Sequence, residues 1–263
     1  MKSSWNWLEE MLSAQPGHIS CSLRNLRTGE SFGWNADEPH PSASVIKIYL
    51  MAYLYRCFQE GFLSPEQRVP MEKSLLSSSS GILHFLRDVP ELSVRDLIEL
   101  MIIVSDNSAT NLLIDLAGME KVNAWLRDDL HLAQTRLCRK MMDLEAIARG
   151  RQNITTAGET ADFLSAVWRG ELVSPAASAE MLSILKHQQF QHMIPDRLTP
   201  ILGEGVIGNK TGGLDGVVHD AAIIDTEDYP FVLCFFGSET DVPSFRRLMQ
   251  DASLRVFRQI QGQ

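Results

Sequence analysis

The sequence predicts a two-lobed α/β fold in which an antiparallel sheet, built from both ends of the chain, is flanked by helices and carries an inserted all-helical lobe. The first observation is a strand pattern near the amino end, where apolar and polar residues alternate over 19–26 and a second strand follows over 31–34. The second is a set of apolar runs near the other end, at 206–211, 217–224 and 229–237. The third is the helical pattern of nearly everything between them. We therefore expect one domain over residues 1–263, with an α/β lobe of 1–40 and 201–263 and an all-α lobe of 41–200.

The individual elements have readable boundaries. A first helix is expected over 4–13, because Gln15-Pro16-Gly17 stops it, and Arg27-Thr28-Gly29-Glu30 is expected to be a hairpin turn. The run 45–60 is apolar almost all round, which predicts a buried central helix rather than a surface one. The less regular stretch 136–157 predicts a long functional loop. Further helices are expected at 94–104, 109–117, 121–128, 160–168, 178–187 and 242–261.

Composition and charge exclude several classes of protein. The chain has 263 residues, 44% of them hydrophobic and 22% charged, and can bury a core without metals or disulfides. Its formal net charge of −9 and its lack of a Lys/Arg cluster argue against a nucleic-acid partner. No apolar run is long enough to cross a membrane. We expect a small-molecule substrate and no cofactor, and the oligomeric state is open.

Two features bear on the compartment. The first ten residues lack the apolar core of a signal peptide. The four cysteines are widely spaced in apolar surroundings, which favours buried free thiols over bridges: Cys21, Cys57, Cys138 and Cys234. We expect a cytoplasmic protein, or a secreted one from which a leader has been removed.

Three short motifs that can carry chemistry occur in order along the chain. They are Ser44-Val45-Ile46-Lys47, Ser105-Asp106-Asn107 and Lys210-Thr211-Gly212. Each is weak alone, because the first pattern occurs again at Ser183-Ile184-Leu185-Lys186, where it indicates only an exposed helix face. The ordered set is far more specific than any member.

The positions of these residues suit nucleophilic catalysis. Ser44 and Lys47 stand one turn apart at the start of a helix and so share a face. A serine hydroxyl becomes a good nucleophile when a neighbouring base takes its proton, and a lysine can be that base only if its pKa falls. Lys210, on a strand facing the helix, can supply the like charge that lowers it. The helix amino terminus places a positive dipole where an oxyanion would form.

With these motifs in place, the chain resembles the class A β-lactamases and related penicillin-binding serine enzymes over nearly its whole length. The resemblance implies a β-lactamase/transpeptidase-like fold and a covalent acyl-enzyme on Ser44, with Lys47 as partner base and Ser105 as proton relay to the leaving nitrogen. It implies that Asn107 binds the amide side chain of the substrate and that Lys210 and Thr211 hold its carboxylate. The N–H groups of Ser44 and Gly213 would form the oxyanion hole.

The chain also departs from that family. Aligning 135–137 on the loop that follows the Ser-Asp-Asn motif puts Met141 where class A enzymes have the glutamate that activates the deacylating water. Asp143 and Glu145 lie nearby, so we expect deacylation to be slow or to use one of them; a loop cap or a salt bridge is the other interpretation of each. Where many β-lactamases have an arginine that grips the carboxylate, His219 is the only candidate.

Other motifs indicate rival functions less well. Gly203-Glu204-Gly205-Val206-Ile207-Gly208 matches a dinucleotide pattern and nearly a P-loop, but no clear strand precedes it and no helix follows. No histidine has metal-ligand spacing, and no serine has the elbow of a Ser-His-Asp hydrolase. Three functions remain open: a β-lactamase, a peptidase, amidase or esterase with the same machinery, and a penicillin-binding acyl trap with little turnover.

Overall fold

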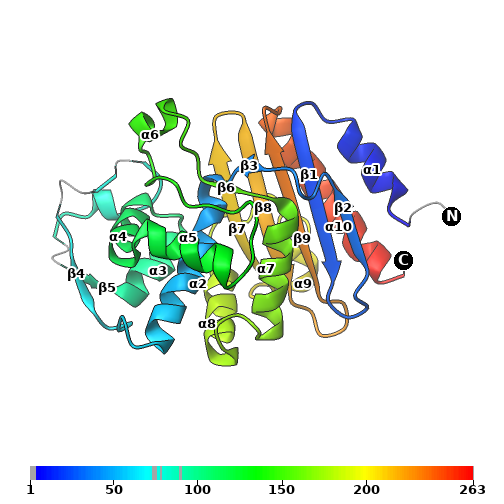
Figure 1. Cartoon of the computed structure of the whole chain (residues 1–263). Coiled ribbons are helices and arrows are strands. Elements are labelled where there is room, and N and C mark those ends of the chain that lie inside the picture. The colour runs from blue at the N-terminus through cyan, green and yellow to red at the C-terminus, as the bar shows by residue number, and fades with distance from the viewer. Residues whose placement is uncertain (1–3, 73–75, 78, 89–90, 263) are drawn as a thin grey trace.

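The computed structural model describes residues 4–72, 76–77, 79–88 and 91–262, and its centre is a five-stranded antiparallel sheet (Figure 1). The strand order is β2-β1-β9-β8-β7, so the central pairing of β1 with β9 joins the two ends of the chain. This confirms the predicted origin of the sheet. The strands are β1 (His18–Asn25), β2 (Ser31–Trp34), β7 (Ile207–Leu214), β8 (Val217–Ile224) and β9 (Phe231–Ser238).

Helices cover both faces of this sheet (Figure 1). On one face lie α1 (Asn6–Ser13) and α10 (Val242–Ile260), and on the other lie α7 (Ala157–Arg169) and α8 (Pro175–Lys186). Strand β9 serves both cores, because Phe231, Leu233 and Phe235 face α10 while the alternate residues face the helical side. A strand that is buried on both sides is apolar along its whole length, which explains the apolar run at 229–237 in the sequence.

The helical part of the chain is built around α2 (Ile46–Gln59), in which 11 residues are buried. This confirms the predicted central helix. Around it pack α3 (Val94–Ile103), α4 (Asn107–Ala117) and α5 (Met119–Asp128). Polar side chains fix where two of them begin: Ser93 and Asp96 form a capping box at α3, and Asp106 accepts the Ala109 N–H at the start of α4.

The segment 41–200 differs from the expectation of an all-helical lobe. It contains two small ladders, β3 (His40–Pro41) with β6 (Ile154–Thr155) and β4 (Arg68–Pro70) with β5 (Glu91–Ser93). Ladders of two or three residues are too short to leave an alternating pattern, so the sequence gives no sign of them. The same applies to the short helices α6 (Leu144–Ala148) and α9 (Thr199–Leu202), and to the single turns η1 (Ala43–Val45) and η3 (Leu83–Phe85).

The position of α7 is a second difference. Its residues fall in the segment assigned to the helical lobe, yet it packs on strands β1, β8 and β9. No helix among the described residues is long and apolar enough to cross a membrane.

Candidate active site

Ser44 lies at the junction between the sheet and the central helix. It is the middle residue of η1, which leads directly into α2, and the preceding Ala43 adopts a left-handed φ of 45°. Strand β7 packs directly against this turn: a Cβ on Gly212 would come within 3.2 Å of Ala43 Cβ and of the Ser42 carbonyl oxygen. A side chain here would make unusually tight contacts, so glycine favours this close approach, which places the Lys-Thr-Gly motif beside Ser44.

Lys47 is fully buried one turn after Ser44 and makes three hydrogen bonds. Its Nζ donates to the Ser105 carbonyl oxygen at 2.8 Å, to Ser105 Oγ at 3.0 Å and to Asn107 Oδ1 at 2.8 Å. Ser105 itself has a left-handed φ of 54°, which turns both its carbonyl and its hydroxyl toward the lysine. The first and second motifs are therefore joined, as their chemistry requires.

Ser105 also connects Lys47 to the third motif. Lys210 Nζ lies 3.1 Å from Ser105 Oγ and 2.9 Å from the Thr211 carbonyl oxygen, so one hydroxyl bridges two buried amines. When Lys47 is neutral, its lone pair can accept the Ser105 proton while Ser105 Oγ accepts from the Lys210 ammonium. The three side chains form a continuous hydrogen-bonded chain from Lys210 on β7 to Lys47 on α2, one turn after Ser44.

Burial and like charge make Lys47 a base. Burial lowers the pKa of Lys47 well below its ordinary value, the neighbouring Lys210 lowers it further, and Asp106 opposes both. Burial also lowers the pKa of Lys210, to about 7, against the opposing charge of Asp220. Both shifts favour the neutral amine, and the like charge of Lys210 adds to burial at Lys47, which suits Lys47 to act as the base.

Asp106 and Asn107 organise the opposite wall. The Asp106 carboxylate accepts the N–H groups of Ile82 and Leu83 at 2.7 and 2.9 Å, which ties residues 79–83 to the start of α4. Asn107 Nδ2 donates to Ser79 Oγ at 2.7 Å. The role of Asp106 was not predicted, because the motif gives no sign of which backbone N–H groups its carboxylate accepts.

These residues border a cavity of about 530 Å³, a size suited to a small molecule. The predicted residues that line it are Ser44, Ser105, Asn107, Thr211 and Gly213, whereas Lys47 and Lys210 lie buried beneath it. Its outer wall is apolar and comes from four separate segments: Met141, Met142, Leu144, Ile147, Phe190, Met193, Leu214 and Val242. The charged residues that the structure places in this lining, Arg139 and Arg246, are both basic.

Comparison with known proteins identifies this arrangement. The model of a β-lactamase enzyme family matches residues 4–260. The chain belongs to the β-lactamase enzyme family. This confirms the resemblance and the fold drawn from the three motifs.

Curated relatives and solved structures agree with the family. β-Lactamase L2 of Stenotrophomonas maltophilia is 30% identical over 63% of this chain, an alignment that spans only 54% of that protein. β-Lactamase CARB-4 of Pseudomonas aeruginosa is 24% identical over 96% of this chain and 86% of its own length. Among solved structures, a β-lactamase from Sphaerobacter thermophilus DSM 20745 superposes with a TM-score of 0.88 at 29% identity, covering 98% of both chains. PBP-A superposes with a TM-score of 0.87 at 24% identity over 98% of this chain and 96% of its own.

The loop that carries Met141 is held at both of its edges. Asn111 on α4 accepts the Met141 N–H at 2.7 Å and donates to its carbonyl oxygen at 3.1 Å. Asn153 accepts the N–H groups of Cys138 and Arg139 and donates to the Arg139 carbonyl oxygen. The Met141 side chain thus faces the cavity, at the position where the sequence alignment expects a glutamate in class A β-lactamases.

The structure does not bring Asp143 or Glu145 to the cavity. Asp143 caps α6 by accepting the Ala146 N–H at 2.9 Å, and Glu145 is exposed and forms an ion pair with Arg149 one turn on. Neither residue is among those that line the cavity. The helix cap and the salt bridge are therefore what the structure shows for these two carboxylates.

His219 needs a similar correction. Its ring is fully buried in the sheet rather than in the cavity lining: Nε2 lies 2.7 Å from the Pro41 carbonyl oxygen and Nδ1 accepts the Gly237 N–H at 3.1 Å. Burial lowers the pKa of this ring to about 4, so it is neutral at physiological pH. A neutral ring with both nitrogens engaged cannot grip a carboxylate.

Arg246 on α10 is a cavity residue that sequence reasoning missed. It lines the cavity beside His192, and its Nε is one of the few buried polar side-chain atoms with no hydrogen-bond partner in the described part of the chain. No motif surrounds Arg246, and it follows Lys210 by a whole strand pair, so only the fold brings it here.

Proposed function

We propose that this protein is a serine hydrolase that opens β-lactams through a covalent acyl-enzyme on Ser44 and releases the product slowly. The observation that carries the proposal is the buried Lys47–Ser105–Lys210 path beside Ser44. It supplies a neutral base for the serine, a relay for its proton and a cation for the substrate. The three residues of this path come from three separate elements: α2, the turn before α4, and β7.

Acylation follows from the geometry with the atoms balanced. Neutral Lys47 takes the Ser44 proton while Ser44 Oγ attacks the lactam carbonyl, and the N–H groups of Ser44 and Gly213 stabilise the oxyanion. The ring C–N bond then breaks, and Ser105 passes a proton to the leaving nitrogen. The nitrogen stays attached to the product, so the whole lactam is added to the protein.

Arg246 is proposed to replace His219 as the partner of the substrate carboxylate. Lys210 and Thr211 hold that carboxylate from β7, and Arg246 approaches it from α10 with an unpaired buried Nε. A guanidinium binds a carboxylate through two parallel hydrogen bonds, which fixes the orientation of the substrate as well as adding affinity.

Slow release follows from the cavity lining. Hydrolysis of the acyl-enzyme needs a base for water, and no carboxylate occurs among the described residues that border the cavity. A thioether at Met141 cannot accept a proton. The same lack favours a second function, a peptidase or esterase whose acyl group passes to another acceptor, and a mutant of PBP-A at 24% identity has been solved as an acyl-enzyme complex with penicillin G.

The test is intact-protein mass spectrometry with a penicillin, alongside turnover of a chromogenic cephalosporin. The wild type is expected to gain the mass of one penicillin and to lose it slowly. Ser44→Ala must abolish the adduct, whereas Ser183→Ala, in the other Ser-x-x-Lys copy on the exposed face of α8, must not. An adduct without turnover favours the peptidase-like function, turnover without an adduct contradicts slow release, and neither adduct nor turnover contradicts the β-lactam proposal.

A further inference from the structure

The main chain that leads to Ser44 is held by two buried imidazoles that the acylation chemistry does not use. Strand β3 (His40–Pro41) ends just before Ser44, and Ala43 between them is in the left-handed region. A non-glycine residue in that region is strained and persists only where its surroundings fix it. Part of that restraint comes from the Ser42 N–H, which donates to the Asn153 carbonyl oxygen at 2.7 Å.

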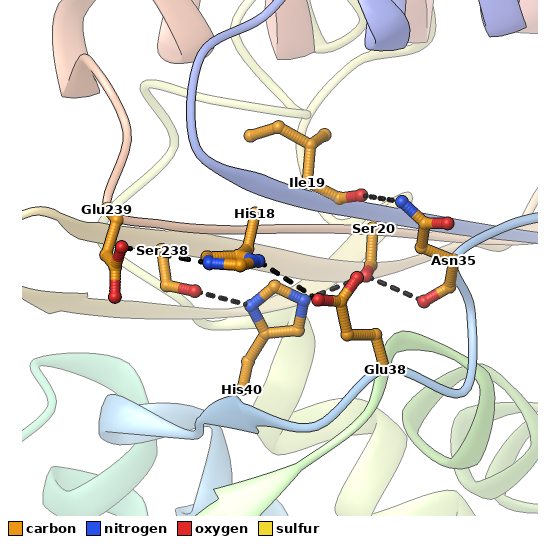
Figure 2. A network of polar contacts seen from close by, with 8 residues as sticks. All are labelled: His18, Ile19, Ser20, Asn35, Glu38, His40, Ser238 and Glu239. Carbon is orange, nitrogen blue, oxygen red and sulfur yellow. Dashed lines mark hydrogen bonds and ion pairs between the residues drawn. The ribbon is translucent and has the colours of Figure 1, made fainter.

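His40 supplies a second restraint from its own side chain. Figure 2 shows its ring lying between two serines, with Nε2 2.8 Å from Ser20 Oγ on β1 and Nδ1 2.9 Å from Ser238 Oγ on β9. Ser20 donates its own proton to the Asn35 carbonyl oxygen at 2.7 Å, so it must accept from His40. The proton of His40 is therefore on Nε2, and Nδ1 accepts from Ser238.

His219 supplies a third restraint from β8. His219 Nε2 lies 2.7 Å from the Pro41 carbonyl oxygen, which can only accept, so Nε2 carries a proton and donates it to Pro41. Nδ1 lies between the Gly237 N–H at 3.1 Å and the Val218 carbonyl oxygen at 2.9 Å, and in the neutral ring it accepts from Gly237. The two imidazoles meet edge to face with centroids 5.7 Å apart, and both pack on Phe236. Together they attach residues 40 and 41 to β1, β8 and β9.

We propose that His40 and His219 are positioning residues for Ser44: as neutral rings they fix the His40–Ser42 main chain against the sheet and hold the nucleophile turn in its strained, reactive geometry. The inference rests on the proposed function only in taking Ser44 as the nucleophile. Protonation of His219 at Nδ1 would exchange the hydrogen bond from the Gly237 N–H for one to the Val218 carbonyl oxygen. Protonation of His40 would put a cation beside the other ring.

The surroundings keep both rings neutral. Burial, His219 and His18 lower the pKa of His40 and Glu38 opposes them, which together bring it to about 4. The charged groups that face His40 lie on the exposed side: His18 on β1, Glu38 in the loop before β3, and Glu239 after β9 (Figure 2). His18 bridges the two carboxylates at 3.1 and 3.7 Å, so they do not bond to His40.

The decisive experiment compares His219→Phe with His219→Gln. Glutamine places an amide N–H where Nε2–H lies and cannot titrate, so it keeps the donor to Pro41; phenylalanine fills the space without a donor. The rate of Ser44 modification by a fluorophosphonate, which replaces the P–F bond by a Ser44 Oγ–P bond and releases fluoride, is measured at pH 7. We expect His219→Phe to react at least about tenfold more slowly and His219→Gln to stay near wild type.

A pH series and a milder variant complete the test. Between pH 6 and 4 the modification rate of the wild type should fall more steeply than that of His219→Gln, because the wild type has one more ring that takes up a proton. Circular dichroism should show that both proteins remain folded over this range. Ser238→Ala, which removes only the donor to His40 Nδ1, should slow modification a few-fold. His18→Gln, on the exposed side of the same network, should match the wild-type rate at pH 7.

Two outcomes would overturn the inference. One is a wild-type rate in both His219→Phe and Ser238→Ala. The other is a ¹⁵N spectrum of histidine-labelled protein in which either buried ring is charged at pH 6 or carries its proton on Nδ1. The fluorophosphonate assay needs no β-lactam, so a failed β-lactam assay would leave this test intact. If Ser44 reacts with the fluorophosphonate and His219→Phe reacts at the wild-type rate, only the positioning role is contradicted.

Discussion

At the scale of single residues, the identity of residue 141 decides what happens to the acyl-enzyme. The Met141 backbone is fixed by two hydrogen bonds to Asn111, so a different side chain there would still face the cavity. Met141→Glu is expected to shorten the lifetime of the penicillin adduct by roughly 10²–10⁴-fold, the usual contribution of a placed general base. The lifetime is read by mass spectrometry after excess penicillin is removed.

The controls for that change are the two neighbouring carboxylates. Asp143→Asn keeps a good helix cap and Glu145→Gln removes only an exposed ion pair, so both should fold normally. Both should leave the adduct lifetime unchanged. A longer lifetime in either variant would show that α6 moves its carboxylate into the cavity after acylation.

Arg246 makes a second prediction at this scale. Arg246→Ala should weaken the binding of carboxylate-bearing substrates before acylation by about tenfold to a hundredfold, the equivalent of ~1.5–3 kcal/mol for a hydrogen bond to a charged group. The rate constant of acylation itself should change little. Arg247→Ala, on an exposed position of the same helix, is the matched control. Equal effects on a substrate whose carboxylate is esterified would contradict the assignment.

At the scale of elements, strand β8 tunes the cation on β7. Asp220 on β8 lies opposite Thr211, accepts Asn209 Nδ2 at 2.9 Å and the Ile194 N–H at 3.0 Å, and raises the pKa of Lys210. Its two hydrogen bonds also fix residues 190–194, which form one wall of the cavity. The strand therefore acts on the site both through charge and through shape.

Asp220→Asn should move the alkaline limb of acylation to lower pH. In the wild type, acylation should fall as pH rises through about 7, because Lys210 then loses the proton that binds the carboxylate and feeds Ser105. Without the negative charge of Asp220 the pKa of Lys210 drops further. The pH profile of acylation measures this shift. The control is Asp225→Asn, since Asp225 directly follows β8 and pairs with Lys186. An unmoved limb would assign it to a group other than Lys210.

The elements also show how far sequence could reach. Long periodic segments were predicted well: β8 matches its expected range, α2 is shorter than expected by one residue at each end, and α10 by one residue at its carboxyl end. The contact of Lys47 and Lys210 with Ser105 agrees with the predicted positions of the helix and the strand that carry the two lysines. The role expected for His219 was wrong, because neighbouring residues on a strand face opposite ways and its ring turns into the sheet. Arg246 was missed because its helix returns to the cavity only in three dimensions.

At the scale of the whole molecule, the site lies where two hydrophobic cores approach one another. One core fills the helical side of the sheet and the other lies between the sheet and helices α1 and α10. Strand β7, at the edge of the sheet, presents Lys210 to the helical side, where it is fully buried. The burial that makes the two lysines chemically useful also costs the fold stability, since a buried ammonium loses its hydration.

That cost predicts how stability depends on pH. The pKa of Lys210 is about 7 in the folded protein and near 10.5 when unfolded, so between these values the unfolded chain binds more protons. The free energy of unfolding should therefore rise with pH from about 7 to about 10.5, by about 5 kcal/mol for this one group at about 1.4 kcal/mol per unit. Lys210→Met removes the charge and keeps most of the volume, so its unfolding free energy at pH 7 should exceed that of the wild type, and its rise toward pH 10 should be shallower. Urea unfolding at pH 7, 8.5 and 10 measures both, and Lys186→Met, which breaks a partly exposed ion pair with Asp225, should leave the slope as it is. The contrary result would be a Lys210→Met variant that is less stable than the wild type at pH 7 and keeps the full rise of unfolding free energy with pH. Lys210 would then form a net stabilising pair with Asp220. Its pKa could not then explain a loss of acylation near neutral pH.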